Sequence, residues 1–148
     1  MKILILNGPN LNLLGRRQPE IYGHETMEET LEKLRRVYPG TEIELRQSNS
    51  EGGLIDILQD YGYREEVAGI ALNAGGYTHT SVALADAVSA VPVPVVEVHI
   101  SNPQGREEMR HRSYLAGVCA GTIAGFGRES YRLAVDYLVN RAEADGRG

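Results

Sequence analysis

The sequence predicts an α/β fold, a doubly wound parallel sheet of about five strands with helices on both faces. Short apolar runs bounded by turn residues alternate from end to end with longer segments of helical periodicity. The first run, residues 3–6, stops abruptly at the sequence NGPN, as a buried parallel strand does. Strand–helix alternation of this kind is typical of parallel sheets, whose strands need crossover connections.

Five segments are expected to form the strands. They cover residues 2–7, 42–47, 69–73, 93–99 and, more weakly, 121–124. Residues 42–47 alternate charged and apolar side chains, which favours an edge position in the sheet. Pro92 and Pro94 confine the start of the fourth strand rather than its middle.

The helices are expected between these strands. Thr26 and Glu29 have capping-box spacing and begin a helix that ends near residues 38–40. Asn49 or Ser50 can cap a second helix that extends through residue 58. A third helix is expected over residues 80–90, and a last helix follows the turn at 125–127 and includes residues 133–138, with a frayed tail at 142–148.

The helix over residues 80–90 follows a glycine turn. Residues 73–81 read NAGGYTHTS, in which the two glycines permit a tight turn and Thr78 or Thr80 can cap the helix.

Composition limits the function classes. At 148 residues a single domain spanning 1–148 is expected, and the net charge of −5 argues against nucleic acid as the partner. Cys119 is the single cysteine, so no internal disulfide is possible, and it is expected to be a small buried side chain. The first apolar run is too short for a signal sequence or a membrane span. A reducing, cytoplasmic setting with no membrane partner fits best.

Candidate chemistry follows three strand ends, which should lie along one edge of the sheet. The residues after the first strand include Arg16, Arg17 and Tyr22, and the glycine turn carries His79. The period of two along a strand places Glu97, His99 and Ser101 on one face.

Each of these side chains also has a purely structural interpretation. His79 could be a turn residue, His99 a satisfied core histidine, Arg16 and Arg17 a solvated pair, and Tyr22 a half-buried aromatic side chain. Their convergence on one edge favours a site instead. His24 and His111 lack such neighbours and are interpreted as structural.

Absent residue types narrow the reaction. The lysines are Lys2, which starts a strand, and Lys33, which should face solvent, so a Schiff base is not expected. The sequence lacks GxxxxGK[ST] and GxGxxG phosphate-binding motifs, and no His, Cys or Asp cluster has metal-ligand spacing. Tyr, Arg, His and Asn remain, and these suit proton transfer with a stabilised oxyanion.

Several ordered motifs resemble those of the type II 3-dehydroquinate dehydratases. They are residues 7–15 (NGPNLNLLG), Arg17, Pro19, Tyr22 and Gly23, residues 47–49 (QSN), 77–81 (YTHTS) and 97–102 (EVHISN), and Arg110 with His111. The resemblance spans nearly the whole chain. It implies a flavodoxin-like fold, the shikimate pathway and loss of water from 3-dehydroquinate to give 3-dehydroshikimate, in aromatic biosynthesis or in quinate breakdown. It also implies no cofactor, no metal and no lysine imine.

The resemblance implies roles for the residues that match it. Tyr22 corresponds to the general base that takes a proton alpha to the ketone, and Arg17 to the group that holds the phenolate. A free phenol has a pKa of about 10, and a neighbouring cation lowers a phenol's pKa by about 1–3 units. Asn10 corresponds to the residue that holds a water at the enolate oxygen. His99, oriented by Glu97, corresponds to the general acid that protonates the departing hydroxyl.

The resemblance also implies binding roles and an assembly. Asn73 and the amides of Ile100 and Ser101 would bind the substrate carboxylate, and His79 and Arg110 the ring hydroxyls. An aspartate at the position of Asp86 reaches the site of a neighbouring subunit in the family, within a dodecamer built of trimers.

The sequence departs from the family pattern at three positions. Ser50 stands where the family often has His, and Ala74 and Gly76 replace a more usual Pro and Ala. These changes bear on loop stiffness and affinity rather than on the type of reaction. Two other hypotheses stay open: a flavodoxin-like domain that binds a nucleotide or flavin without catalysis, and a structural oligomer subunit that has lost activity.

Overall fold

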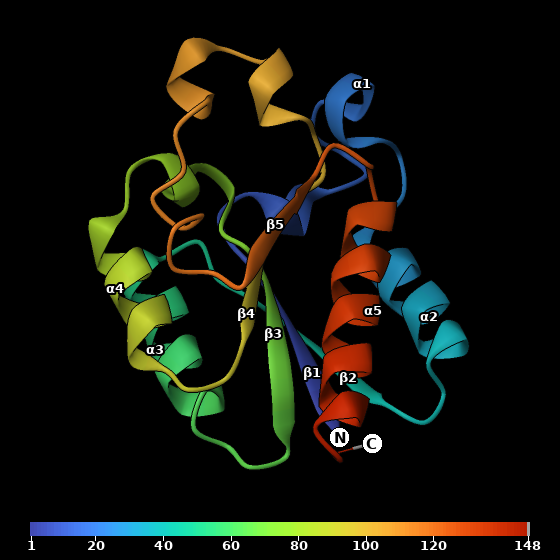
Figure 1. Ribbon diagram of the computed structural model, residues 1–148. Coiled ribbons are helices and arrows are strands. Elements are labelled where there is room, and N and C mark those ends of the chain that lie inside the picture. The colour runs from blue at the N-terminus through green and yellow to red at the C-terminus, as the bar shows by residue number, and fades with distance from the viewer. Residues whose placement is uncertain (148) are drawn as a thin grey trace.

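The computed structural model describes residues 1–147 and has one parallel sheet at its centre (Figure 1). The strands are β1 (Lys2–Asn7), β2 (Glu42–Gln47), β3 (Val67–Asn73), β4 (Val95–His99) and β5 (Gly121–Ala124). They lie in the order β2-β1-β3-β4-β5, and every neighbouring pair is parallel. This is the flavodoxin-like strand order. The predicted fold class and the edge position of residues 42–47 are therefore confirmed.

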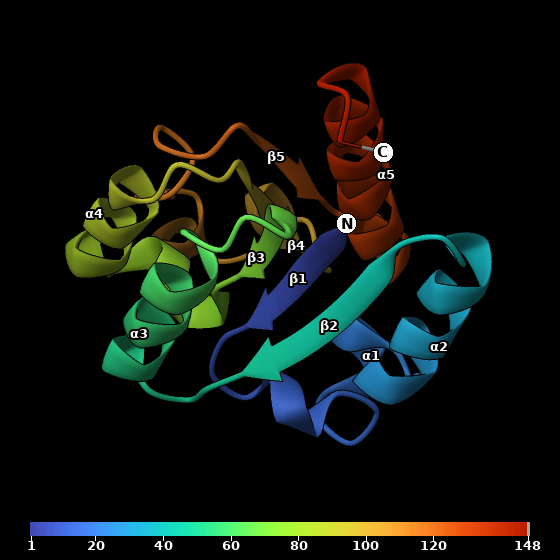
Figure 2. The ribbon, with the colours of Figure 1, turned by 90° about the horizontal axis from the view of Figure 1, so that it is seen from below.

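Helices cover both faces of the sheet, as Figure 2 shows in a view from below. On one face lie α2 (Met27–Val37) and α5 (Glu129–Ala144), and on the other α3 (Glu51–Tyr61) and α4 (Val82–Ala90). Successive residues of β1 face opposite sides, so that Ile3 and Ile5 pack with α2 and α5, while Leu4 and Leu6 pack with α3 and α4. This double burial explains the unbroken apolar run of the first strand.

Side-chain caps fix where two of these helices begin. The Thr26 hydroxyl accepts a hydrogen bond from the Glu29 amide at 3.2 Å, which confirms the predicted start of α2. Ser50 caps α3 by accepting from the Gly53 amide at 3.1 Å. Asn49, the other candidate cap, instead accepts from the Asn10 backbone at 3.0 Å.

The prediction that Thr78 or Thr80 caps the third helix is wrong. Residues Gly75–His79 form a separate 3₁₀ turn, and α4 begins after it at Val82. The cap is Ser81, whose hydroxyl accepts from the Leu84 amide at 2.9 Å. The hydroxyl of Thr78 is buried and has no hydrogen-bond partner among the described residues.

Two strand starts and the chain end also differ from expectation. β3 begins two residues earlier than residue 69, and β4 begins at Val95 rather than 93, because Pro94 has no N–H to donate. Helix α5 continues through Ala144 with Ala142 buried, so the frayed tail predicted from residue 142 is wrong for the first three positions. Position 148 of that tail lies outside the described residues.

The N-terminus and the end of α5 lie at one end of the sheet, and the four-residue helix α1 (Pro19–Tyr22) lies beyond the other, where the strands end (Figure 1). No helix within residues 1–147 is both long enough and apolar enough to cross a membrane.

Candidate active site

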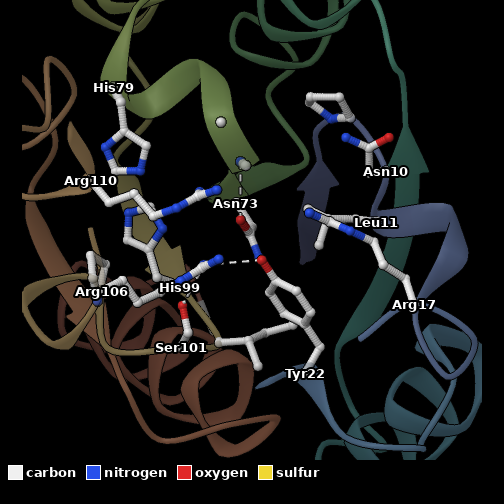
Figure 3. A pocket seen from close by; sticks show the side chains of 15 residues that line it. Asn10, Leu11, Arg17, Tyr22, Asn73, His79, His99, Ser101, Arg106 and Arg110 are labelled. Atoms are coloured by element: carbon white, nitrogen blue, oxygen red, sulfur yellow. Dashed lines mark hydrogen bonds between the residues drawn. The ribbon is translucent and has the colours of Figure 1, made fainter. Parts of the chain in front are cut away.

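The carboxyl ends of β1, β3 and β4 border a single pocket, which Figure 3 shows from close by. It contains every residue proposed from the sequence as catalytic or substrate-binding except Glu97 and Asp86: Asn10, Arg17, Tyr22, Asn73, His79, His99, Ile100, Ser101 and Arg110. The expected edge of the sheet is thus where these side chains meet. Glu97 lies beneath the pocket surface, and Asp86 is exposed on α4.

His99 is the last residue of β4, and its ring is hydrogen-bonded to the carboxylate of Glu97. The Nε2 atom of His99 lies 2.5 Å from Oε2 of Glu97, which is wholly buried. Burial raises the pKa of the Glu97 carboxyl, but hydrogen bonds from His99 and two hydroxyls outweigh it and leave that pKa below its usual range. An ionised carboxylate can only accept, so Nε2 must donate and the ring orientation is fixed.

Tyr22 enters the pocket from α1 and contacts two guanidiniums. Nη1 of Arg106 donates to the Tyr22 hydroxyl at 3.0 Å and to the Ser101 hydroxyl at 3.2 Å (Figure 3). Arg17 lies over the face of the tyrosine ring, with its guanidinium carbon 4.8 Å from the ring centroid. Arg106 therefore donates to the phenol oxygen, a role that the sequence predicted for Arg17 alone.

Arg106 was missed from the sequence because its role depends on a contact 84 positions away. The one available signal was its place shortly after the strand end at residues 97–102, in a segment rich in charge. Hydrophobic periodicity and local motifs do not report such distant contacts.

Asn10 is held in an unusual backbone conformation. Its φ is 70°, in the left-handed region where asparagine is among the residues most often found. The Asn10 N–H donates to Oδ1 of Asn49, which also accepts from Nε2 of Gln47, both at 3.0 Å. The QSN segment therefore anchors the start of the loop that carries Asn10.

A buried network positions Asn73. Its Nδ2 donates to the Tyr131 hydroxyl at 2.9 Å, and that hydroxyl donates to Oδ1 of Asn7 at 2.8 Å. Oδ1 of Asn73 accepts from the Gly75 amide at 3.2 Å. Burial raises the pKa of Tyr131, so the phenol stays neutral and can donate.

His79 and Arg110 line the wall of the pocket beside His99. The rings of His79 and His99 stack with centroids 6.3 Å apart, and Nδ1 of His79 lies 2.7 Å from the carbonyl oxygen of Arg112. Nε of Arg110 donates to Glu107 at 2.7 Å. The structure brings both residues to the pocket, as predicted.

The glycines near the strand ends have unequal roles. A Cβ on Gly8 would lie 2.4 Å from the carbonyl oxygen of Ala74, so the ends of β1 and β3 can approach only with glycine there. A Cβ on Gly76 would meet nothing within 4 Å. There is therefore room for a larger side chain at position 76, where the family more usually has alanine.

The charge of the pocket favours an anion. Its lining includes three arginines and two histidines, and no Asp or Glu is among the lining residues within the described chain. Within residues 1–147 no group of three or more His, Cys, Asp or Glu side chains is placed to hold a metal ion. What the pocket does offer is a phenol, an imidazole and cations around one small space, which suits acid–base chemistry on an anionic molecule.

Fold and site together define a flavodoxin-like α/β enzyme whose side chains can move protons. The family model described as "Dehydroquinase class II" matches residues 1–139, and the chain belongs to this family.

Relatives of known name match the sequence of this chain over almost their whole length. The chain is 54% identical over 141 residues to a 3-dehydroquinate dehydratase of Corynebacterium glutamicum, covering 94% of this chain and 96% of the relative. It is 53% identical over 141 residues to a 3-dehydroquinate dehydratase of Exiguobacterium, covering 94% of each. The crystal structure of a type II dehydroquinase from Butyrivibrio crossotus superposes with a TM-score of 0.89 at 44% identity, covering 93% of this chain and 97% of that one.

Proposed function

We propose that this protein dehydrates 3-dehydroquinate to 3-dehydroshikimate through an enolate, with Tyr22 as general base and His99 as general acid. The observation that carries the proposal is the presence of a phenol and an imidazole on different walls of one cation-lined pocket (Figure 3). The names of the relatives supply the substrate, and the cationic lining suits its carboxylate.

The first step removes a proton from the carbon alpha to the ketone. Tyr22 acts in its phenolate form, stabilised by the Arg106 donor and by Arg17 over the ring. As the C–H bond breaks, its electrons form the enolate and the proton passes to the phenolate oxygen. Asn10 holds a water that donates to the enolate oxygen.

The second step expels the hydroxyl. The enolate electrons return to form the conjugated double bond, and the C–O bond breaks as protonated His99 donates its proton, so that water leaves. Glu97 stabilises the imidazolium before this transfer. Tyr22 has then gained one proton and His99 has lost one, and exchange with solvent restores both.

Binding contacts complete the proposal. Asn73 and the backbone amides of Ile100 and Ser101 bind the substrate carboxylate, and His79 and Arg110 bind the ring hydroxyls.

The positions of the lysines support a route without an imine. Lys2 lies at the start of β1, at the end of the strand away from the pocket, and its Nζ contacts Glu44 at 3.0 Å and Glu42 at 3.5 Å. Lys33 is exposed on α2 and pairs with Glu25. Neither lysine lines the pocket.

The proposal includes a cytoplasmic homo-oligomer, a dodecamer built of trimers. Asp86 is exposed on α4 and free of the pocket of its own chain, which is compatible with a contribution to a neighbouring site. Light scattering after size-exclusion chromatography tests the assembly. A monomer at micromolar concentration would contradict it.

The decisive assay follows the absorbance of the enone product after 3-dehydroquinate is added to the purified protein. Tyr22→Phe should lower kcat by about 10²–10⁴ while substrate still binds, and His99→Ala should slow breakdown of the enolate. Tyr137→Phe, an exposed tyrosine on α5, is the matched control and should keep the full rate.

Three results would overturn parts of the proposal. Absence of product with the unaltered protein would refute the function, and a yellow flavin released on denaturation would then favour a binding module. A full rate for Tyr22→Phe would refute the base assignment. Inactivation by borohydride in the presence of substrate, with label on Lys2 or Lys33, would refute the route without an imine.

A further inference from the structure

Two hydroxyl groups from distant segments converge on the buried carboxylate behind His99. Oγ of Ser113 donates to Oε2 of Glu97 at 2.8 Å, and Oγ1 of Thr122 donates to Oε1 at 3.1 Å. With His99 at 2.5 Å from Oε2, each oxygen of Glu97 has at least one donor. Neither hydroxyl lines the pocket beside Tyr22, and both line a second, adjoining cavity that Glu97 and His99 also line.

The backbone fixes the direction of both donors. Oγ of Ser113 accepts hydrogen bonds from the amides of Leu115 at 3.2 Å and Ala116 at 3.0 Å, so its own hydrogen is directed to the carboxylate. Thr122 lies on β5 directly beside Glu97 in the register of the parallel pair β4–β5. The two hydroxyls are thus held in place independently of the substrate pocket.

The remaining charged neighbours do not substitute for these hydroxyls. His79 stacks on His99, and Arg110 and His111 line the second cavity, but the sole ion pair of Glu97 among the described residues is with His99. Burial and the negative charge of Glu97 together raise the pKa of the Cys119 thiol. A wholly buried carboxylate with one ionic partner depends on neutral donors to stay charged.

We infer that Ser113 and Thr122 are positioning residues, which keep Glu97 ionised and so keep His99 in its proton-donating form. This inference rests on the proposed function, in which His99 is the general acid. Both residues act through Glu97 and touch neither substrate nor the reacting atoms. Their contribution should therefore appear in the titration of Glu97 rather than in substrate affinity.

The sign of the effect follows from the charge. Hydrogen bonds from the hydroxyls stabilise the ionised form of Glu97, so their removal raises the pH at which Glu97 takes up a proton. A neutral Glu97 no longer favours the imidazolium of His99. The acid limb of kcat is set by Tyr22, which must be a phenolate, so the change should be seen in the titration of Glu97 itself, which should move to higher pH.

The test follows the ionisation of Glu97 by carbon-13 NMR of labelled glutamate side chains in Thr122→Val, Ser113→Ala and the double variant, and measures KM for each. Each single variant should raise the midpoint of the Glu97 titration by about one pH unit, and the double variant further, with KM nearly unchanged. Thr122→Ser, which retains a hydroxyl, should restore the original midpoint. Thr78→Val is the matched control, because it removes a buried hydroxyl of the same cavity that has no partner.

The Glu97→Gln variant identifies the signal, because the resonance assigned to Glu97 should be absent from its spectrum. In that background Thr122→Val and Ser113→Ala should shift no other glutamate titration. A Glu97 midpoint that stays in place in both single variants, or that moves equally in Thr78→Val, would overturn the inference.

The NMR titration needs no turnover, which keeps the inference apart from the proposed function. If the unaltered protein proved inactive on 3-dehydroquinate, the proposed function would fail while this titration still decided the role of the hydroxyls. An unchanged Glu97 titration in correctly folded variants would refute that role.

Discussion

Replacing Tyr131 by Phe tests the buried network beneath the pocket. The phenol oxygen accepts from Asn73 at 2.9 Å and donates to Asn7 at 2.8 Å, and the tyrosine is wholly buried. Phe would preserve the packing of the ring but leave one acceptor and one donor without partners. Each buried polar group left unpaired costs about 1–3 kcal/mol, so with two such groups the free energy of unfolding should fall by about 2–6 kcal/mol.

Urea denaturation at fixed protein concentration measures this loss, because assembly would otherwise make the midpoint depend on concentration. Tyr137→Phe removes an exposed hydroxyl from the same helix and should change the free energy of unfolding by less than about 0.5 kcal/mol. Equal stability of the two variants would show that the buried hydroxyl bonds contribute nothing, and the account of how Asn73 is positioned would be wrong.

Three further predictions follow from other contacts. Arg106→Met should lower kcat by about 10–100-fold, since a hydrogen bond to a charged group contributes about 1.5–3 kcal/mol; unchanged steady-state kinetics would contradict this. Gly8→Ala should destabilise the fold, because its Cβ would lie 2.4 Å from a backbone oxygen, whereas Gly76→Ala should leave the melting temperature within a few degrees. Burial raises the pKa of Cys119 to about 12 from 9.0, so its thiol should react at pH 8 at least about 100-fold more slowly in the folded than in the unfolded protein. For the same reason stability should decline as the pH rises above about 9, and a flat unfolding free energy between pH 8 and 10 would contradict that linkage.

The fold was predictable because its signals are local. The apolar run of β1, the Thr26 cap and the alternating pattern of β2 each identify an element from a few neighbouring residues. Strand ends in a parallel sheet meet at one edge, so the lining of the pocket could be predicted as well.

Contacts between distant segments could not be predicted in this way. Arg106 meets Tyr22 across 84 positions, and Tyr131 meets Asn7 across 124. Thr122 reaches Glu97 only because β5 pairs beside β4 in one particular register. The cap of α4 was misplaced for a related reason, since the 3₁₀ turn before it follows from how the segment packs rather than from its capping residues.

Thr122 stands on the outermost strand of the sheet and is itself exposed, although its hydroxyl is bonded to the most deeply enclosed carboxylate of the site. Thr122 thus connects the exposed edge of the sheet to the group that supports the general acid. Another subunit packed against β5 would keep water from competing for this hydroxyl. Specific activity measured over a dilution series would then depend both on the assembly of subunits and on proton transfer by the general acid.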